Sequence, residues 1–135
     1  MLRYAFLPSD FHPQFLILGE SSDIASLIRC LRDFATAMET TQVGHQPPAD
    51  GSKDVRLTLV PSEATQGMHV SDTRPTEFEW RLNAEGAEVF ATLIEEALNT
   101  PDPAGSVMLE VRAPGEIPVK ISYGEFTEQF LIEEF

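Results

Sequence analysis

The segment TEFEWRLNAEGAEVFATLIEEAL, residues 76–98, contains the two patterns on which the fold depends. In its first seven residues, Phe78, Trp80 and Leu82 alternate with charged side chains, which is typical of a strand with one buried face. Asn83 follows and can accept a hydrogen bond from a free backbone N–H at the start of a helix. The sequence therefore predicts a strand that runs directly into a helix over 83–98. The predicted core stripe of this helix is Val89, Phe90, Leu93, Ile94 and Ala97.

The first half of the chain has the same order of patterns. An apolar run over 14–20 includes Gly19 near its end, and Ser21 and Ser22 are the expected N-caps of a helix. The apolar residues that follow are spaced by three and four, which again indicates a helix with one buried side. Its stripe is Ile24, Leu27, Ile28, Leu31, Ala35 and Met38, with Phe34 at the border.

Alternating apolar side chains predict three further strands, and the N-terminal LRYAFL could add another. The three strands are 55–60, 106–112 and 117–123. Pro118 lacks a backbone N–H, so the last of these strands should lie at a sheet edge or begin at the proline. Gly115 is expected in the turn before it.

These elements predict a single α+β domain over residues 1–135. Helices with one apolar side and alternating strands favour two helices packed on one face of a mainly antiparallel sheet. A ferredoxin-like strand order is the first choice, with an extra C-terminal strand and tail. Segments 40–54 and 61–75 are expected to be long loops because Pro, Gly and polar residues predominate in them.

Acidic residues are concentrated in the second half of the chain. Residues 1–75 contain nine Asp and Glu against six Lys and Arg, whereas residues 76–135 contain thirteen against three, and the net charge is −13. Nucleic acids and anionic membranes attract Lys and Arg, so neither is an expected partner. The charge favours a basic protein as the partner.

The candidate partner-binding residues are glutamates of the helix 83–98 and of the C-terminal tail. The helix dipole disfavours negative charge near a helix C-terminus, where Glu95 and Glu96 lie, so their presence suggests a use for the charge. The alternative is a solvated face that keeps the protein soluble. In the tail, Phe126 and Phe130 could anchor a partner or dock the tail onto the core. The full candidate set is Glu85, Glu88, Glu95, Glu96, Glu128, Glu133 and Glu134.

No motif in the sequence indicates catalysis, a cofactor or a metal site. The three histidines fall in predicted loops without ligand spacing: His12, His45 and His69. Cys30 lies in a helix pattern and is expected to behave as a small hydrophobe. We therefore expect a non-enzymatic binding protein. The alternative is a small enzyme or ligand-binding domain whose pocket lies between the helices and the loops 40–54 and 61–75.

The N-terminus lacks the pattern of a secretory signal, and no apolar run approaches the ~18 residues of a membrane span. A cytoplasmic location is therefore expected. An exposed edge strand or the outer face of the sheet could also support a homodimer.

Three stretches together resemble the small acidic immunity proteins that bacteria pair with polymorphic toxins. They are FLILGESSDIASLIRCLRDFA (15–35), FEWRLNAEGAEVFATLIEEAL (78–98) and VKISYGEF (119–126). The resemblance lies in the layout, a strand leading into a capped helix, then a second such unit with an acidic helix, then a closing strand. It implies a stoichiometric inhibitor that covers the basic active surface of a toxin. No site residue is transferred from the family.

Overall fold

The computed structural model describes residues 2–8, 13–46, 54–100, 105–113 and 115–124. In these residues the helices are α1 (Ser21–Ala37) and α2 (Ala84–Leu98). The strands are β1 (Arg3–Leu7), β2 (Gln14–Gly19), β3 (Thr41–Val43), β4 (Arg56–Pro61), β5 (Gly67–Val70), β6 (Glu77–Leu82), β7 (Gly105–Leu109) and β8 (Val119–Tyr123). The fold is α+β, as the sequence predicts.

The strands of the described residues form two mixed sheets, sheet A (β1-β2-β8-β7) and sheet B (β3-β4-β6-β5). In each sheet the central pair is parallel and both outer strands are antiparallel to their neighbours. The prediction of one sheet with a ferredoxin-like order is therefore wrong, although four of the six described strand pairings are antiparallel, as predicted. The reason is that α1 leads from sheet A to sheet B and α2 leads back, so the strands immediately before and after each helix lie in different sheets.

The two halves of the chain repeat one arrangement, two strands, a helix and two strands. Each half contributes its first hairpin to one sheet and its second hairpin to the other. Sheet A thus combines the first hairpin of the first half with the last hairpin of the second half, and sheet B combines the other two. Neither sheet is complete without both halves.

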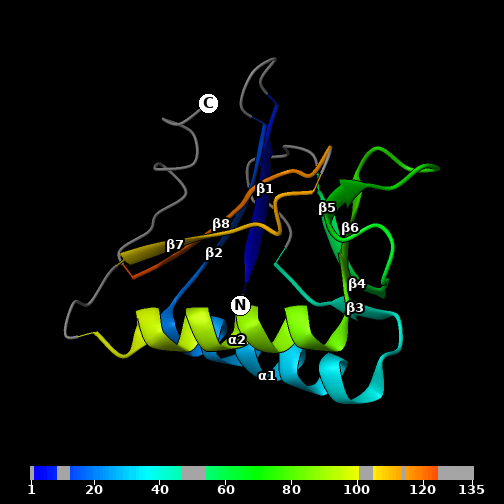
Figure 1. Ribbon diagram of the computed structural model, residues 1–135. Helices are drawn as coiled ribbons and strands as arrows, with labels where there is room; N and C mark the ends of the chain where they lie inside the picture. The colour runs from blue at the N-terminus through cyan, green and yellow to red at the C-terminus, as the bar shows by residue number, and fades with distance from the viewer. Residues whose placement is uncertain (1, 9–12, 47–53, 101–104, 114, 125–135) are drawn as a thin grey trace.

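The two helices lie side by side beneath both sheets and run in opposite directions (Figure 1). The aromatic rings of Phe6 and Phe15 in sheet A each lie 4.9 Å from the ring of Phe78 in sheet B. Trp80 of β6 packs against Phe90 of α2, with 5.4 Å between ring centroids. One hydrophobic core therefore joins both sheets and both helices.

Two of the strands, β3 and β5, lie inside the segments 40–54 and 61–75 that were expected to be loops. Strand β3 has only three residues, and β5 has four, which is too short for a clear alternation of apolar and polar side chains. Gly67 begins β5 with a φ of 102°, a conformation that favours glycine. Pairing with the longer strands β4 and β6, rather than local pattern, accounts for both.

The starts of the two helices differ from each other. Asn83 caps α2 as predicted, because its side-chain oxygen accepts a 2.7 Å hydrogen bond from the backbone N–H of Gly86. In α1 the prediction of a serine cap is wrong, since the cap residue is Glu20 and Ser21 is already helical. There the carboxylate of Asp23 accepts a 3.0 Å hydrogen bond from the Glu20 backbone N–H. This bond from the third helical residue back to the cap residue belongs to a capping box.

The last two strands are shorter than the sequence pattern indicates. Strand β7 ends at Leu109, so Val111 lies beyond it, and Gly115 is in the following turn with a φ of 75°. Pro118 immediately precedes β8, which lies centrally in sheet A between β2 and β7. Of the two predicted placements of the proline, the one at the beginning of the strand is confirmed.

Candidate functional site

Helix α2 is held at both ends by contacts to the sheets. Its N-terminus follows β6 directly and is capped by Asn83. Near its C-terminus, the hydroxyl of Tyr123 in β8 donates a 2.7 Å hydrogen bond to the backbone oxygen of Ala97. Between these points Phe90 packs on Trp80. The direction in which α2 presents its outer face is therefore determined by the core.

The outer face of α2 carries two large apolar residues. The exposed fraction is 49% for Val89 and 40% for Leu93, so the prediction that both belong to the core stripe is wrong. Ala87 and Ala91 are fully buried instead, next to the buried Phe90. Small alanines allow close packing, which rotates the buried side of the helix away from Val89 and Leu93. A pattern of large apolar residues alone does not indicate this rotation.

Three of the predicted glutamates lie exposed on the same outer side of α2. They are Glu85, Glu88 and Glu96. Together with Val89 and Leu93 they form what we call the α2 surface. Glu85 lies in the first turn, where the helix dipole favours a carboxylate, whereas Glu96 lies near the C-terminal end, where the dipole disfavours it.

Arg32 of α1 partly neutralises the acidic helix. Its guanidinium donates two hydrogen bonds to the carboxylate of Glu95, at 2.9 and 3.2 Å, and its Nε lies 3.7 Å from a carboxylate oxygen of Glu88. These hydrogen bonds and the positive charge hold the pKa of Glu95 below its ordinary value. Glu95 is thus engaged within the protein, and the helix is less one-sided in charge than its sequence indicates.

A further carboxylate joins the N-terminal end of α2 from the loop between β4 and β5. The side-chain amide of Asn83 donates a 3.3 Å hydrogen bond to a carboxylate oxygen of Glu63, which is exposed. Sequence reasoning missed Glu63 because it is twenty residues away from Asn83 in the chain and stands in a segment without pattern. The tail candidates lie outside the described residues: Glu128, Glu133 and Glu134.

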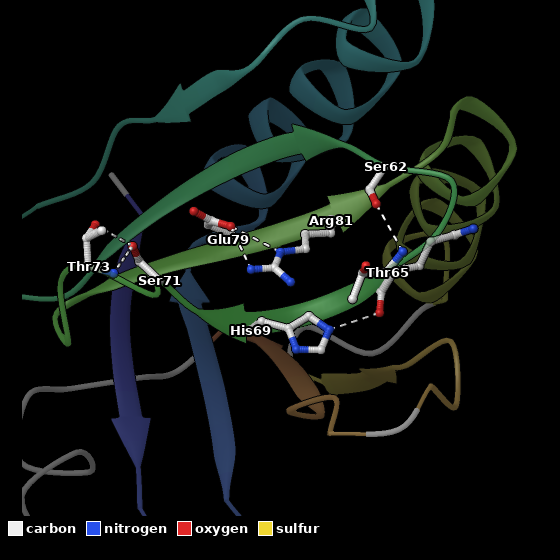
Figure 2. A network of polar contacts seen from close by, with 8 residues as sticks. Ser62, Thr65, His69, Ser71, Thr73, Glu79 and Arg81 are labelled. Carbon is white, nitrogen blue, oxygen red and sulfur yellow. Dashed lines mark hydrogen bonds and ion pairs between the residues drawn. The ribbon is translucent and has the colours of Figure 1, made fainter.

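Several of the basic side chains lie on sheet B, away from α2, and each is paired there. Arg81 contacts Glu79 at 3.0 Å, and the two side chains extend side by side over the face of sheet B (Figure 2). The other two pairs on this sheet and its flanking residues are Arg74 with Glu77 at 3.0 Å and Arg56 with Asp54 at 4.0 Å. This face therefore balances its own charges, whereas the α2 surface does not.

Two of the histidines can be placed, and both make contacts within the protein. His45 Nε2 lies 2.5 Å from the carboxylate of Asp54, and the imidazole stacks on Tyr4 of β1 with 4.9 Å between centroids. The Tyr4 hydroxyl in turn donates to the backbone oxygen of Val43. This cluster connects sheet A to the β3–β4 connection, which is a structural role. His12 lies outside the described residues.

His69 is in strand β5 rather than in the predicted loop. Its Nε2 donates a 3.1 Å hydrogen bond to the backbone oxygen of Gln66, and the ring lies on the same side of sheet B as Arg81 (Figure 2). In the part of the chain that the structure describes, no three His, Cys, Asp or Glu side chains are grouped to hold a metal ion. Within the same residues, neither helix has the length and apolar character needed to cross a membrane.

No protein-family model matches the chain, and no curated protein or solved structure is similar to it at a significant level.

Proposed function

We propose that the protein is a non-enzymatic binding protein that presents the α2 surface to a basic protein partner. The observation that carries this proposal is the combination on α2 of Glu85, Glu88 and Glu96 with the exposed side chains of Val89 and Leu93. Of the described ion pairs, only those of Arg32 involve a glutamate of α2. An exposed acidic surface attracts a cationic partner over distance and speeds association.

The resemblance to immunity proteins suggests one form of this function. The protein would be a cytoplasmic bacterial inhibitor that covers the basic active surface of a toxin in a one-to-one complex. The two-sheet scaffold suits such a role because core packing and the Tyr123 hydrogen bond fix the position of α2, and a preorganised surface loses little entropy on binding. Partner identity is then decided by shape and charge at α2.

Affinity capture with charge variants tests the proposal. Immobilised protein is exposed to a lysate of its own host at low salt, and retained proteins are compared between the wild type and the variant E85Q/E88Q/E96Q. A basic protein that the wild type retains and the variant loses, and that elevated salt releases, supports the proposal. Purification of that protein and titration against both forms then gives the change in affinity.

The matched control is E39Q/D72N/E110Q, which changes the net charge equally at three exposed residues outside α2. Retention must survive in this control, since a loss there would reflect total charge rather than the α2 surface. Equal retention by the wild type and the α2 variant at low salt would refute the proposal.

The alternative of a small enzyme or ligand-binding domain remains a prediction. Its expected pocket would involve residues 47–53, which lie outside the described part of the chain. His45 and Asp54 bring an imidazole and a carboxylate together, but their described contacts are with Tyr4 and Arg56 rather than with a nucleophile. No second function is proposed.

A further inference from the structure

We propose that the partner binds through a segment that has two apolar side chains one helical turn apart, flanked by Lys or Arg, and that these apolar side chains pack on Val89 and Leu93. The inference rests on the proposed function and specifies the chemistry of the partner at the same surface. It assigns the specificity to the two apolar residues and the long-range attraction to the glutamates.

Val89 and Leu93 form a continuous apolar stripe. Residues four apart on a helix lie on the same face with their Cβ atoms about 5–6 Å apart. Among the described residues, the other exposed large hydrophobic side chains are isolated by comparison, since Val70 is in β5 and Met108 is in β7. Met108 also accepts a contact from the side-chain amide of Gln14 at 3.6 Å. Single exposed apolar residues are ordinary, whereas an adjacent pair on a helix provides an apolar surface on which a side chain of another molecule can pack.

Charge determines which molecule can cover this stripe. Glu85, Glu88 and Glu96 lie on the same exposed side, so the occupant must bring positive charge. A second copy of the chain would bring the same glutamates and a net charge of −13. The chain's own residues 125–135 contain four glutamates and no Lys or Arg. Anionic membranes and nucleic acids would be repelled by these glutamates, so a basic segment of another protein is the occupant that complements the surface.

The arrangement of the α2 surface matches the general anatomy of a binding site. Apolar anchors at the centre provide most of the binding energy, and charged residues at the rim affect association rate and salt dependence. An amphipathic helical segment typically binds its target through apolar anchors such as those at i and i+4. Two such anchors on the partner would therefore meet Val89 and Leu93 while its Lys or Arg side chains meet the glutamates.

Two synthetic peptides of identical composition test the inference directly. Each is about 15 residues long, the length at which a helix begins to be stable in water, and is built from Leu, Ala and Lys. In the striped peptide the leucines fall at i and i+4, and in the isomer the same leucines are spread around the helix. Fluorescence anisotropy of labelled peptides gives the affinity at ~20 mM and ~500 mM salt. The comparison separates the charge–charge contribution to binding, which salt screens, from the apolar contribution, which it does not screen.

We expect the wild type to bind the striped peptide about tenfold more tightly than the isomer. The variant V89Q/L93Q should lose this difference and keep its affinity for the isomer. Gln is a good helix former and both positions are exposed, so circular dichroism should confirm an unchanged fold. The control V70T/M108Q, which alters two exposed apolar residues elsewhere, should retain the full difference.

The outcomes distinguish the inference from the function on which it rests. If V89Q/L93Q preserves the tenfold difference in affinity between the two peptides, the leucines do not pack on Val89 and Leu93 and the inference is wrong. If the difference is absent in the wild type, the inference is wrong in the same way, while a loss of affinity for both peptides in E85Q/E88Q/E96Q would still support an acidic binding surface. If that variant binds both peptides as the wild type does at ~20 mM salt, the proposed function fails as well.

Discussion

Replacement of Phe78 tests the joint between the two sheets on which the position of α2 depends. The side chain is 1% exposed, and its ring lies 4.9 Å from both Phe6 and Phe15. Truncation of a buried Phe to Ala typically costs ~3–5 kcal/mol, and an aromatic pair contributes ~0.5–1.5 kcal/mol beyond the buried area. We expect F78A to lose about 4 kcal/mol of unfolding free energy, and F78L to lose about 1–2 kcal/mol because most of the volume is retained.

Urea unfolding followed by fluorescence provides the measurement. Trp80 is the only tryptophan and is fully buried, so its emission reports exposure of the core directly. The sharper test is a double-mutant cycle of F78L with F15L, which isolates the energy of the ring contact between the sheets. The expected coupling is about 0.5–1.5 kcal/mol.

The control for this cycle is F78L with F34L. Phe34 is a buried residue of α1, and among the described aromatic contacts none joins it to Phe78. The loss of unfolding free energy in F34L should add to the loss in F78L within about 0.3–0.5 kcal/mol. A coupling between Phe15 and Phe78 no larger than this control would refute the view that the two sheets share one core at this point.

Three further predictions concern ionisable groups of the described residues. Arg32 lowers the pKa of Glu95, so the stability that this pair contributes should be complete above the ordinary pKa of 4.5 and should be lost as the pH falls below it. The difference in thermal midpoint between the wild type and R32Q should therefore shrink in acid, and the control R29Q should show no such trend. Burial and the nearby Asp33 raise the pKa of the Cys30 thiol, so alkylation at mildly alkaline pH should be slower in the folded protein than in urea, and equal rates would contradict this. Removal of the ring in H45A should reduce the free energy of unfolding by about 1–2 kcal/mol, whereas H45F should lose less because a ring can still stack on Tyr4; a neutral H45A would exclude a role in joining the sheets.

The elements that local chemistry determines could be predicted from the sequence, and those that depend on distant pairing could not. The strand at 76–82 and its Asn83-capped helix follow from alternation, helical spacing and a capping side chain within one segment. Strand β5 has no such signal, because its four residues become a strand only through pairing with β6. The division into two sheets depends on which hairpins associate, and no local pattern contains that information.

The candidate site divides in the same way. The acidic character of α2 is visible in its sequence, but the approach of Arg32 to Glu95 joins two helices more than sixty residues apart. The exposure of Val89 and Leu93 was missed because the helical spacing of apolar residues does not distinguish a buried stripe from one that is turned outward. Buried alanines at 87 and 91 were the available signal, since small residues indicate where a helix packs most closely.

The carboxylates in the acidic second half of the chain fall into two groups, those with described partners inside the protein and those without a described ion pair. Glu116 accepts hydrogen bonds from the backbone N–H groups of Val111 and Ala113, at 2.7 and 3.1 Å, and so stabilises the turn before β8. Glu79 neutralises Arg81 on sheet B. These carboxylates already have partners, so their removal should reduce stability.

Glu85 and Glu96 have no described ion pair, so their removal should leave stability nearly unchanged and weaken binding of a basic partner. Net charge alone therefore overstates the acidic surface that a partner could reach, and the proposed function depends on the few carboxylates that the fold leaves exposed beside Val89 and Leu93.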